Sequence, residues 1–393
     1  MKKLLIIGVL SIFMINSNFA QTRISVKPGE SELQMVNNDR AGFSVVNNVA
    51  YIDVQLEKLS KGENVELQVP GYGTSFNIGN PDLPVFNRLI EIPLDAEVVV
   101  NVLGYNEIVV KLADYDINKV IAPSQASVSK SADLDKIPYV KNEVVYGTDA
   151  WFSNPIARVH ESGTMRGVRL GRLEINPIAY NPVTGELRIY NDLKIEVSFV
   201  NANISKTDSY KKRFYSPAFT GVMSGLLNYS SVAKDLNING TPMKFVIVSH
   251  RMFEATLAPF VAWKKKQGFN TILRFTDETE VGNTPTSIKA FLQGLYTAGT
   301  EADPAPSFVM FVGDNEQVAA FSGSATDGSH ISDLYFGTYD GAGDLLPEVN
   351  LGRMSAKTVD QLEPLIQKTL LYEQFQMADP SYLGNTLLIA GVD

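Results

Sequence analysis

Three histidines, one serine–aspartate pair and several acidic residues are the candidates for chemistry, because the 393-residue chain contains no cysteine. Without a thiol there is no thiolate nucleophile, no disulfide and no thiolate metal site. His250 follows an apolar segment, where a surface or capping role is common for a lone histidine, and we interpret His160 and His330 in the same way. Ser332 and Asp333 follow His330 too closely to form a catalytic triad, because triads are assembled from distant segments.

Acidic residues in the second half of the chain form a candidate cation site. Asp314 follows the apolar segment Phe308–Val312 and should project from the edge of a sheet. If the later segment from Asp344 to Glu348 is extended, these two residues present their carboxylates on one side. Carboxylates that converge repel each other unless a cation neutralises them, and oxygen ligands suit calcium rather than zinc. The spacing is not that of an EF-hand, and Asp-Gly loops are also common as solvated turns.

Composition limits the number of domains and the kinds of partner. Hydrophobic residues make up 45% of the chain and charged residues 20%, with 43 acidic and 34 basic residues. A chain of this length exceeds a single hydrophobic core, so we expect two or three domains. No basic block is long enough to follow a phosphate backbone, so nucleic acid is not an expected partner.

The first 20 residues have the order of a secretory signal peptide. Lys2 and Lys3 precede the apolar run Leu4–Met14, and small and polar residues lead to Ala20. We expect cleavage after Ala20, with a buried N-terminal strand as the alternative. No later stretch is long and apolar enough for a transmembrane helix, so we expect an exported, soluble mature protein.

Residues 45–200 show the period of two that is typical of β-strands. The apolar segments are short, rich in Val, Ile and Tyr, and separated by turn residues. They are Ala50–Leu56, Val98–Leu103, Glu107–Leu112, Gly167–Ile175, Leu187–Tyr190 and Leu193–Val200. Strands at this spacing, without helical segments between them, predict an all-β sandwich or barrel.

A polar stretch follows at residues 202–240, where Asn, Ser, Lys and Thr dominate. This composition predicts an exposed linker between two domains. Its most basic site is Lys211, Lys212 and Arg213, and Lys234 lies further along the chain. Proteases cut exposed linkers, so we expect the activation cleavage within residues 205–240.

Beyond Pro242 the pattern alternates between strand and helix. The expected strands are Phe245–Val248, Thr271–Phe275, Phe308–Val312, Val349–Leu351 and Thr386–Ala390. The expected helices are Phe253–Gln267, Thr286–Tyr296 and Thr358–Phe375. This alternation predicts a parallel sheet with helices on both faces. The last apolar strand has nothing to cover it, so we expect the domain to continue beyond Asp393.

Several short motifs together carry a resemblance to a known family. In the first half they are Gly79-Asn80-Pro81-Asp82-Leu83-Pro84, Ile137-Pro138-Tyr139-Val140 and Tyr180-Asn181-Pro182-Val183-Thr184. In the second half they are Phe260-Val261-Ala262-Trp263-Lys264, Phe311-Val312-Gly313-Asp314 and Leu351-Gly352-Arg353. The first half resembles the propeptide of the gingipains, the C25 family of cysteine peptidases, and the second half resembles the start of their catalytic domain. The shared order extends over nearly the whole mature chain.

The resemblance implies a multidomain chain: an inhibitory all-β propeptide, sandwich-like or barrel-like, before a caspase-like α/β domain that is incomplete at its C-terminus. Gingipains use a cysteine thiolate as nucleophile and a histidine in a His-Gly motif as general base and acid. None of the three histidines here precedes a glycine, so we expect no catalytic residue in this chain. The 393 residues by themselves should be inactive as a peptidase.

Two further roles are implied only by the resemblance. Arg166 would offer its basic side chain to the specificity pocket of the enzyme, with a solvated arginine as the alternative. A structural calcium ion would be held by the side chains of Asp314, Asp344 and Glu348 and by backbone oxygens near Asp340 and Leu346.

We therefore expect a signal peptide at residues 1–20, a propeptide at 21–204 and a linker with the activation cleavage at 205–240. Residues 241–393 would be the first subdomain of the peptidase domain and the start of the second. The full protein would be a secreted zymogen that cleaves protein or peptide substrates, with its propeptide in contact with the catalytic domain. A non-catalytic secreted binding or inhibitory module and a surface-processing transpeptidase of the secretion apparatus are the alternatives.

Overall fold

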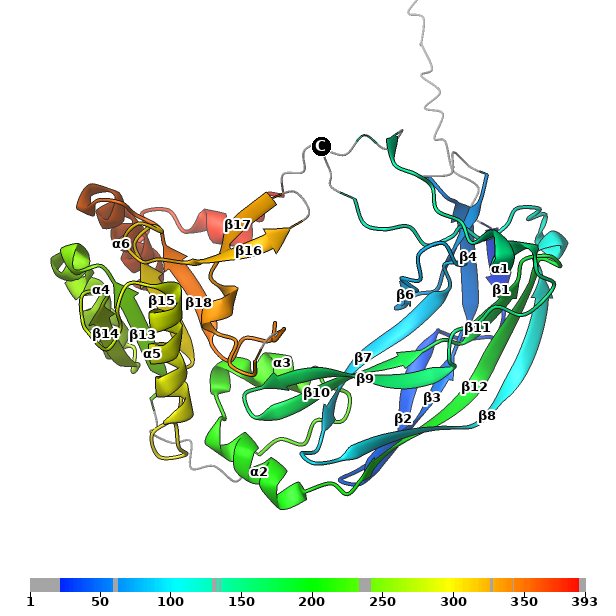
Figure 1. Ribbon diagram of the computed structural model, residues 1–393, viewed down its shortest axis with the longest axis horizontal. Helices are drawn as coiled ribbons and strands as arrows, with labels where there is room; N and C mark the ends of the chain where they lie inside the picture. The colour runs from blue at the N-terminus through cyan, green and yellow to red at the C-terminus, as the bar shows by residue number, and fades with distance from the viewer. Residues whose placement is uncertain are drawn as a thin grey trace, which may run out of the picture.

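The computed structural model describes residues 22–58, 63–128, 133, 136–232, 242–325, 328–341 and 343–388. The described chain has a β-rich half, residues 22–232, and an α/β half, residues 242–388. The two halves lie at opposite ends of the molecule and meet near helices α2 and α3 (Figure 1). The expected signal peptide lies outside the described residues.

Three antiparallel sheets form the β-rich half. The first has the order β1-β4-β5: β1 (Thr22–Ser25), β4 (Tyr51–Leu56) and β5 (Val65–Gln68). The second has the order β6-β7-β10-β9: β6 (Gly73–Thr74), β7 (Pro84–Ile92), β10 (Val168–Ile175) and β9 (Ala157–Met165). The third contains β11 (Ile178–Asn181), β12 (Glu186–Val200), β3 (Gly42–Asn48), β2 (Glu32–Asp39) and β8 (Glu97–Lys111), the last paired with β12. Short helical segments η1 (Leu112–Tyr115) and α1 (Glu143–Gly147) lie between strands β8 and β9.

Strand β12 is longer than the sequence predicts, because two expected strands are joined in it. The pairing of β12 with β8 shifts register between Asn191 and Lys194, and Asp192 has a φ of 47°. Asn191 is buried, and its side chain accepts from the amide of Val49 and donates to the carbonyl of Val49. This bulge lets the chain continue through two residues that otherwise favour a turn.

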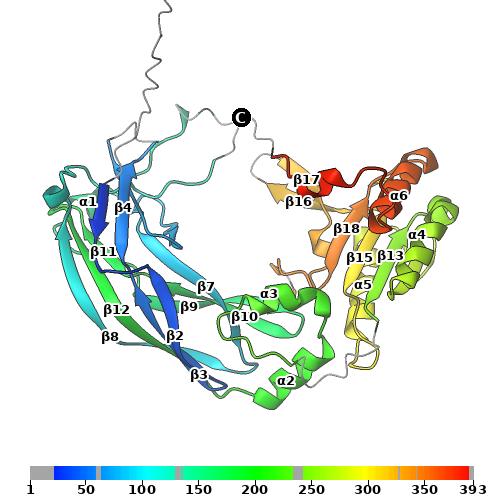
Figure 2. The same cartoon turned by 180° about the vertical axis from the view of Figure 1, so that it is seen from behind.

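A parallel sheet forms the centre of the α/β half, as the sequence predicts. Its order is β14-β13-β15-β18: β14 (Asn270–Phe275), β13 (Lys244–Ser249), β15 (Phe308–Val312) and β18 (Asn350–Met354). Helices α4 (Glu254–Lys266) and α6 (Val359–Glu373) pack on one face, and α5 (Pro285–Thr297) packs on the other. Both views show this sheet between its helices (Figures 1 and 2). Short 3-10 helices η5 (Arg251–Phe253) and η6 (Leu334–Phe336) lie in its connections, and η7 (Ser381–Gly384) follows α6.

Two features near the end of the chain differ from expectation. A hairpin of β16 (Phe321–Ala325) and β17 (Gly328–Ser332) is present where no strand was expected. The expected strand Thr386–Ala390 is not formed over its described residues, and the side chains of Leu387 and Leu388 are 83% and 87% exposed. A strand needs a neighbouring strand to satisfy its backbone groups, and none pairs with this segment in the described chain.

Residues 205–232 do not form the exposed linker that their composition suggests. They form α2 (Ile204–Arg213), the short helix η3 (Pro217–Phe219) and α3 (Thr220–Ser224). Asn203 caps α2 by accepting from the amide of Lys206. The expectation of an exposed linker is therefore wrong for this stretch, because α2 packs against the sheet that contains β10. No helix among the described residues is long and apolar enough to cross a membrane.

Candidate functional site

The β9–β10 hairpin inserts its turn into the α/β half. Arg166 and Gly167 form this turn, with φ angles of 52° and 73°. Positive φ at both central residues matches the twist of a two-residue hairpin turn. A Cβ atom at Gly167 would lie 2.7 Å from the carbonyl oxygen of Tyr210. Both the positive φ and this lack of space therefore require glycine at the position. The turn thus presents Arg166 to the neighbouring half.

Arg166 is only 2% exposed, so a solvated arginine is excluded. Its Nη1 donates to the carbonyl oxygens of Pro306 (2.9 Å) and Glu348 (3.1 Å), and its Nη2 donates to that of Tyr215 (3.3 Å). Pro306 and Glu348 each lie two residues before a strand of the parallel sheet, β15 and β18. Arg166 therefore contacts the amino-terminal edge of this sheet. Open α/β sheets place their active sites at the opposite, carboxyl-terminal edge.

The carboxylate of Glu348 belongs to the same contact. Its Oε2 accepts from the backbone amide of Arg166 (2.5 Å) and from the hydroxyl of Tyr296 (2.7 Å). Burial raises the pKa of Glu348 to about 7, and the two hydrogen bonds oppose this shift. Repulsion from Asp340 raises the pKa further. The backbone amide of Arg166, from the β-rich half, thus supplies one of the hydrogen bonds to this buried carboxyl group.

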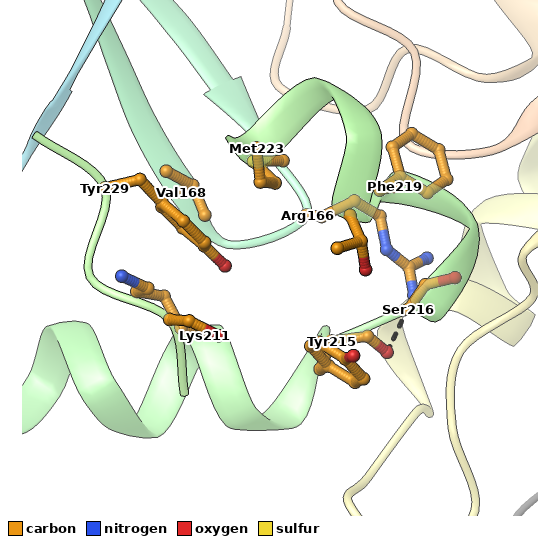
Figure 3. Close-up of a pocket in the computed structure, with 10 residues that line it drawn as sticks. Arg166, Val168, Lys211, Tyr215, Ser216, Phe219, Met223 and Tyr229 are labelled. Carbon is orange, nitrogen blue, oxygen red and sulfur yellow. Dashed lines mark hydrogen bonds between the residues drawn. The ribbon is translucent and has the colours of Figure 1, made fainter. Parts of the chain in front are cut away.

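Lys211 lies beside this contact, at the end of α2, rather than on the surface. Its Nζ is 2.6 Å from a carboxylate oxygen of Glu91 and 2.5 Å from the carbonyl oxygen of Ser230. The side chains of Lys211 and Glu91 are 1% and 7% exposed. Lys211 and Arg166 both line a cavity of about 30 Å³, which has room for one or two water molecules (Figure 3).

The other expected cleavage residues are placed differently. Lys212 and Arg213 are half-buried. Arg213 donates from Nη2 to the carbonyl oxygen of Thr297 (2.6 Å) and from Nε to that of Gly299 (3.0 Å). Lys234 lies outside the described residues. Cleavage within residues 205–240 stays a prediction, but residues 211–213 are held in a packed helix.

The predicted calcium ligands are engaged with protein groups. Asp314 accepts from Ser355 and lies 3.6 Å from Lys357, and the backbone amide of Asn315 is the first cause that lowers the pKa of Asp314. Asp344 accepts from the amides of Asp340 and Leu346. No group of three or more His, Asp or Glu side chains in the described part of the chain is arranged to hold a metal ion. Calcium binding by these residues stays a prediction.

Two carboxyl groups of this loop have raised pKa values. Burial raises the pKa of Asp340, and repulsion from Asp344 raises it further. Asp340 in turn contributes to the raised pKa of Glu348. These acids influence each other electrostatically, as the sequence suggests, although they do not form a ligand cage.

The three histidines do not form a catalytic group. His250 accepts from the amide of Met252 (3.2 Å) and caps η5. His160 lies 3.2 Å from Glu174 on the neighbouring strand β10. The ring of His330 lies over Gly323 in the β16–β17 hairpin. A surface or capping role for His250 agrees with its hydrogen bond.

Asp333 and Ser332 also have structural partners. Asp333 forms two hydrogen bonds with the guanidinium of Arg353 (2.7 and 2.8 Å). Arg353 also donates to the carbonyl oxygens of Gly313 and Val318, which follow β15. Ser332 accepts from the amide of Leu334. The Arg353–Asp333 pair thus positions loops at the carboxyl-terminal edge of the sheet.

Sequence reasoning missed Tyr296 and the segment after α2. The apolar pattern predicts Tyr296 only as the end of a helix, although its hydroxyl donates to Glu348. Phe214 and Phe219 lie in a stretch interpreted as a polar linker, yet both are buried. A signal was available, because residues 214–229 contain several large apolar side chains.

The fold and the contact define a class: a two-part chain whose β-rich half is docked on an α/β half through a buried arginine turn. Comparisons with known proteins then name the family. Residues 29–230 match the Propeptide_C25 family, and residues 238–393 match Peptidase family C25. This chain belongs to peptidase family C25 and contains a C25 propeptide and a region of the peptidase domain. The resemblance to the gingipains is confirmed.

The relatives are gingipains of Porphyromonas gingivalis. Lys-gingipain is 33% identical over 395 residues, which cover 100% of this chain and 22% of the relative. Gingipain R2 is 27% identical over 353 residues, which cover 88% of this chain and 45% of the relative. The chain thus spans less than half the length of these relatives.

Two solved structures from the same organism are also similar. One concerns the zymogenic latency of gingipain K, with 30% identity, a TM-score of 0.44, and coverage of 47% of this chain and 100% of that chain. The other is a complex of RgpB pro- and mature domains, with 24% identity, a TM-score of 0.41, and coverage of 51% of this chain and 98% of that chain.

Proposed function

We propose that this chain is the N-terminal portion of a secreted cysteine endopeptidase precursor, and that its β-rich half is the inhibitory propeptide. The observation that carries the proposal is the family match, with a C25 propeptide followed by a region of a C25 peptidase domain. The buried Arg166 turn supports it, because the propeptide region is docked on the peptidase region within one chain.

Catalysis would come from residues outside these 393, because the chain has no cysteine and none of its histidines precedes a glycine. The parallel sheet with helices on both faces supports a caspase-like domain. The charged and apolar order of residues 1–20 supports export through a signal peptide, to the cell surface or the medium.

Calcium binding by the loop of Asp340, Asp344 and Glu348 is a further part of the proposal. Its support is the resemblance to the gingipains and the raised pKa values of Asp340 and Glu348, which a cation would lower. In the described conformation Asp314 lies 3.6 Å from Lys357, and Glu348 accepts from the Arg166 turn, so calcium would compete with these protein groups.

Reading the gene beyond the codon for Asp393 tests the function. We expect a His-Gly motif followed by a cysteine, a full product that hydrolyses casein, and loss of that activity when the cysteine is replaced by alanine. Residues 22–393 alone should not hydrolyse casein or arginyl and lysyl amides, because they contain no thiol. Turnover by this shorter chain, or a full product that stays inactive after removal of the propeptide, would contradict the proposal.

A second candidate is a non-catalytic secreted inhibitory or binding module, favoured by the absence of cysteine from the chain. A stop codon directly after Asp393 would support this candidate over the peptidase. The same reading of the gene therefore separates the two.

A further inference from the structure

Two arginines from separate segments of the β-rich half donate to backbone carbonyls of the α/β half. Arg166 comes from the β9–β10 turn and contacts the carbonyl oxygens of Pro306 and Glu348. Arg213 comes from the last turn of α2 and contacts those of Thr297 and Gly299. Backbone carbonyls are fixed by the fold, so they form preorganised acceptor sites whatever side chains the α/β half carries.

Arg213 supplies a charge that α5 lacks. The last four carbonyl groups of a helix have no intrahelical donor and carry partial negative charge. Helix α5 ends at Thr297 and has no basic residue in its last turn. Arg213 of α2 donates to Thr297 and to Gly299, just beyond the helix end. A cation from the β-rich half thus stabilises the end of a helix in the other half.

Tyr296, in the last turn of α5, connects the two arginine contacts. Phe214 follows Arg213 and stacks on the ring of Tyr296, with centroids 4.7 Å apart and planes 8° apart. The hydroxyl of Tyr296 donates to Glu348, whose carboxylate also accepts from the backbone amide of Arg166. The two contacts are therefore parts of one continuous interface.

Both contacts depend on the shape of the guanidinium group. Arg166 reaches three carbonyl oxygens and lies 5.3 Å from the ring centroids of both Phe219 and Tyr296. Arg213 uses Nε and Nη2 for two separate carbonyls. A lysine ammonium is a point charge without the planar fork, so it cannot reproduce these bonds.

We propose that Arg166 and Arg213 form a two-point anchor that binds the β-rich half to the amino-terminal edge of the α/β sheet and selects for guanidinium groups. The anchor lies at the edge opposite to the one where α/β sheets place their active sites. The name propeptide for the β-rich half rests on the proposed function, but the association itself requires no catalysis. The two proposals can therefore fail separately.

The test uses residues 22–393 with a recognition sequence for a site-specific protease placed within residues 233–241. After cleavage, the dissociation constant of the two pieces is measured by dilution and gel filtration. We expect the wild-type pieces to co-elute, and R166K and R213K each to raise the dissociation constant at least about tenfold, since each loses charge-assisted hydrogen bonds. The double variant R166K/R213K should separate most readily.

The matched control is R172K, because Arg172 lies on the same hairpin with its side chain 43% exposed. Circular dichroism of the uncleaved chain shows whether each variant folds. Arg213 is only half-buried, so R213K still tests the anchor if R166K does not fold. Separation of the wild-type pieces on cleavage would overturn the anchor. A dissociation constant in R213K equal to that of R172K would overturn the selection for guanidinium.

Discussion

Lys211 is a basic residue in a polar stretch of sequence, yet its side chain is almost fully buried. Burial lowers the pKa of Lys211, and the attraction of Glu91 opposes this shift. A buried ion pair adds little stability compared with an apolar pair, but removing one partner leaves an uncompensated charge. The pair therefore makes residues 204–213 depend on strand β7, which contains Glu91.

The variant K211M should destabilise the chain by about 3–5 kcal/mol, because it leaves Glu91 buried without a cation. Urea unfolding followed by circular dichroism measures the change. K206M on the same helix is the control, because Lys206 and its partner Asp95 are solvent-exposed, and its transition should stay close to that of wild type. The double variant E91L/K211M should regain much of the free energy of unfolding that K211M loses, because no unpaired charge is left buried. An unchanged midpoint in K211M would show that the pair is not buried in solution.

Glu348 gives the stability of the chain a pH dependence. Its pKa is about 7 in the folded chain and about 4.5 without perturbation, so the folded state binds the proton more tightly. The contribution to stability is therefore present below about pH 4.5 and is lost as the pH rises through 7. Its size is on the order of 3 kcal/mol, from 1.36 kcal/mol per pKa unit.

The variant E348Q should not show this loss, because glutamine does not ionise. Relative to E348Q, wild type should become less stable between pH 5 and pH 8, measured by urea unfolding in the presence of a chelator. E363Q serves as the control for an exposed glutamate. Parallel stability curves for wild type and E348Q would show that Glu348 has an ordinary pKa.

At the level of elements, α2 and the segment after it join the two halves. The ion pair of Lys211 with Glu91 connects α2 to β7, and Arg213 and Phe214 contact α5. A protease needs an extended segment of chain in its cleft, so a packed helix resists cleavage until it unfolds locally. Basic residues in α2 are therefore poor cleavage sites, although they are the most basic cluster in this stretch of sequence.

Limited trypsin digestion should cut after Lys234 before it cuts after residues 211–213. The physical reason is that α2 is held by buried contacts, which keep its basic residues out of a protease cleft. N-terminal sequencing of the early fragments should find Asp235, and the variant K234Q should delay the first cut in this region. An early fragment that begins at Arg213 or Phe214 would contradict the packing of α2.

For the whole molecule, thermal unfolding with and without calcium tests whether the loop of Asp340, Asp344 and Glu348 binds the ion. If the ion binds the folded chain, calcium should raise the melting temperature of metal-stripped residues 22–393 by mass action, and magnesium should do so less. D344N should reduce the shift, while D360N, an exposed residue on α6, should leave it unchanged. The same melting temperature in calcium and in excess chelator would remove calcium from the proposal.

Sequence alone determined the two-part organisation, because periods of two and of 3.6 residues follow directly from which faces of strands and helices are buried. Strand β15 was predicted at its observed bounds, because an apolar run in a parallel sheet is buried on both faces. The family also followed from the sequence, through the order of its short motifs.

Only the tertiary structure decided where Arg166, Lys211 and Glu348 lie. Each is charged, and composition predicts charged residues at the surface because desolvation is costly. The cost is met here by partners more than 100 residues away: Glu91 for Lys211, and the Arg166 turn for Glu348. Such pairing has no local signature, because it depends on how two halves of the chain meet and not on the residues beside each one.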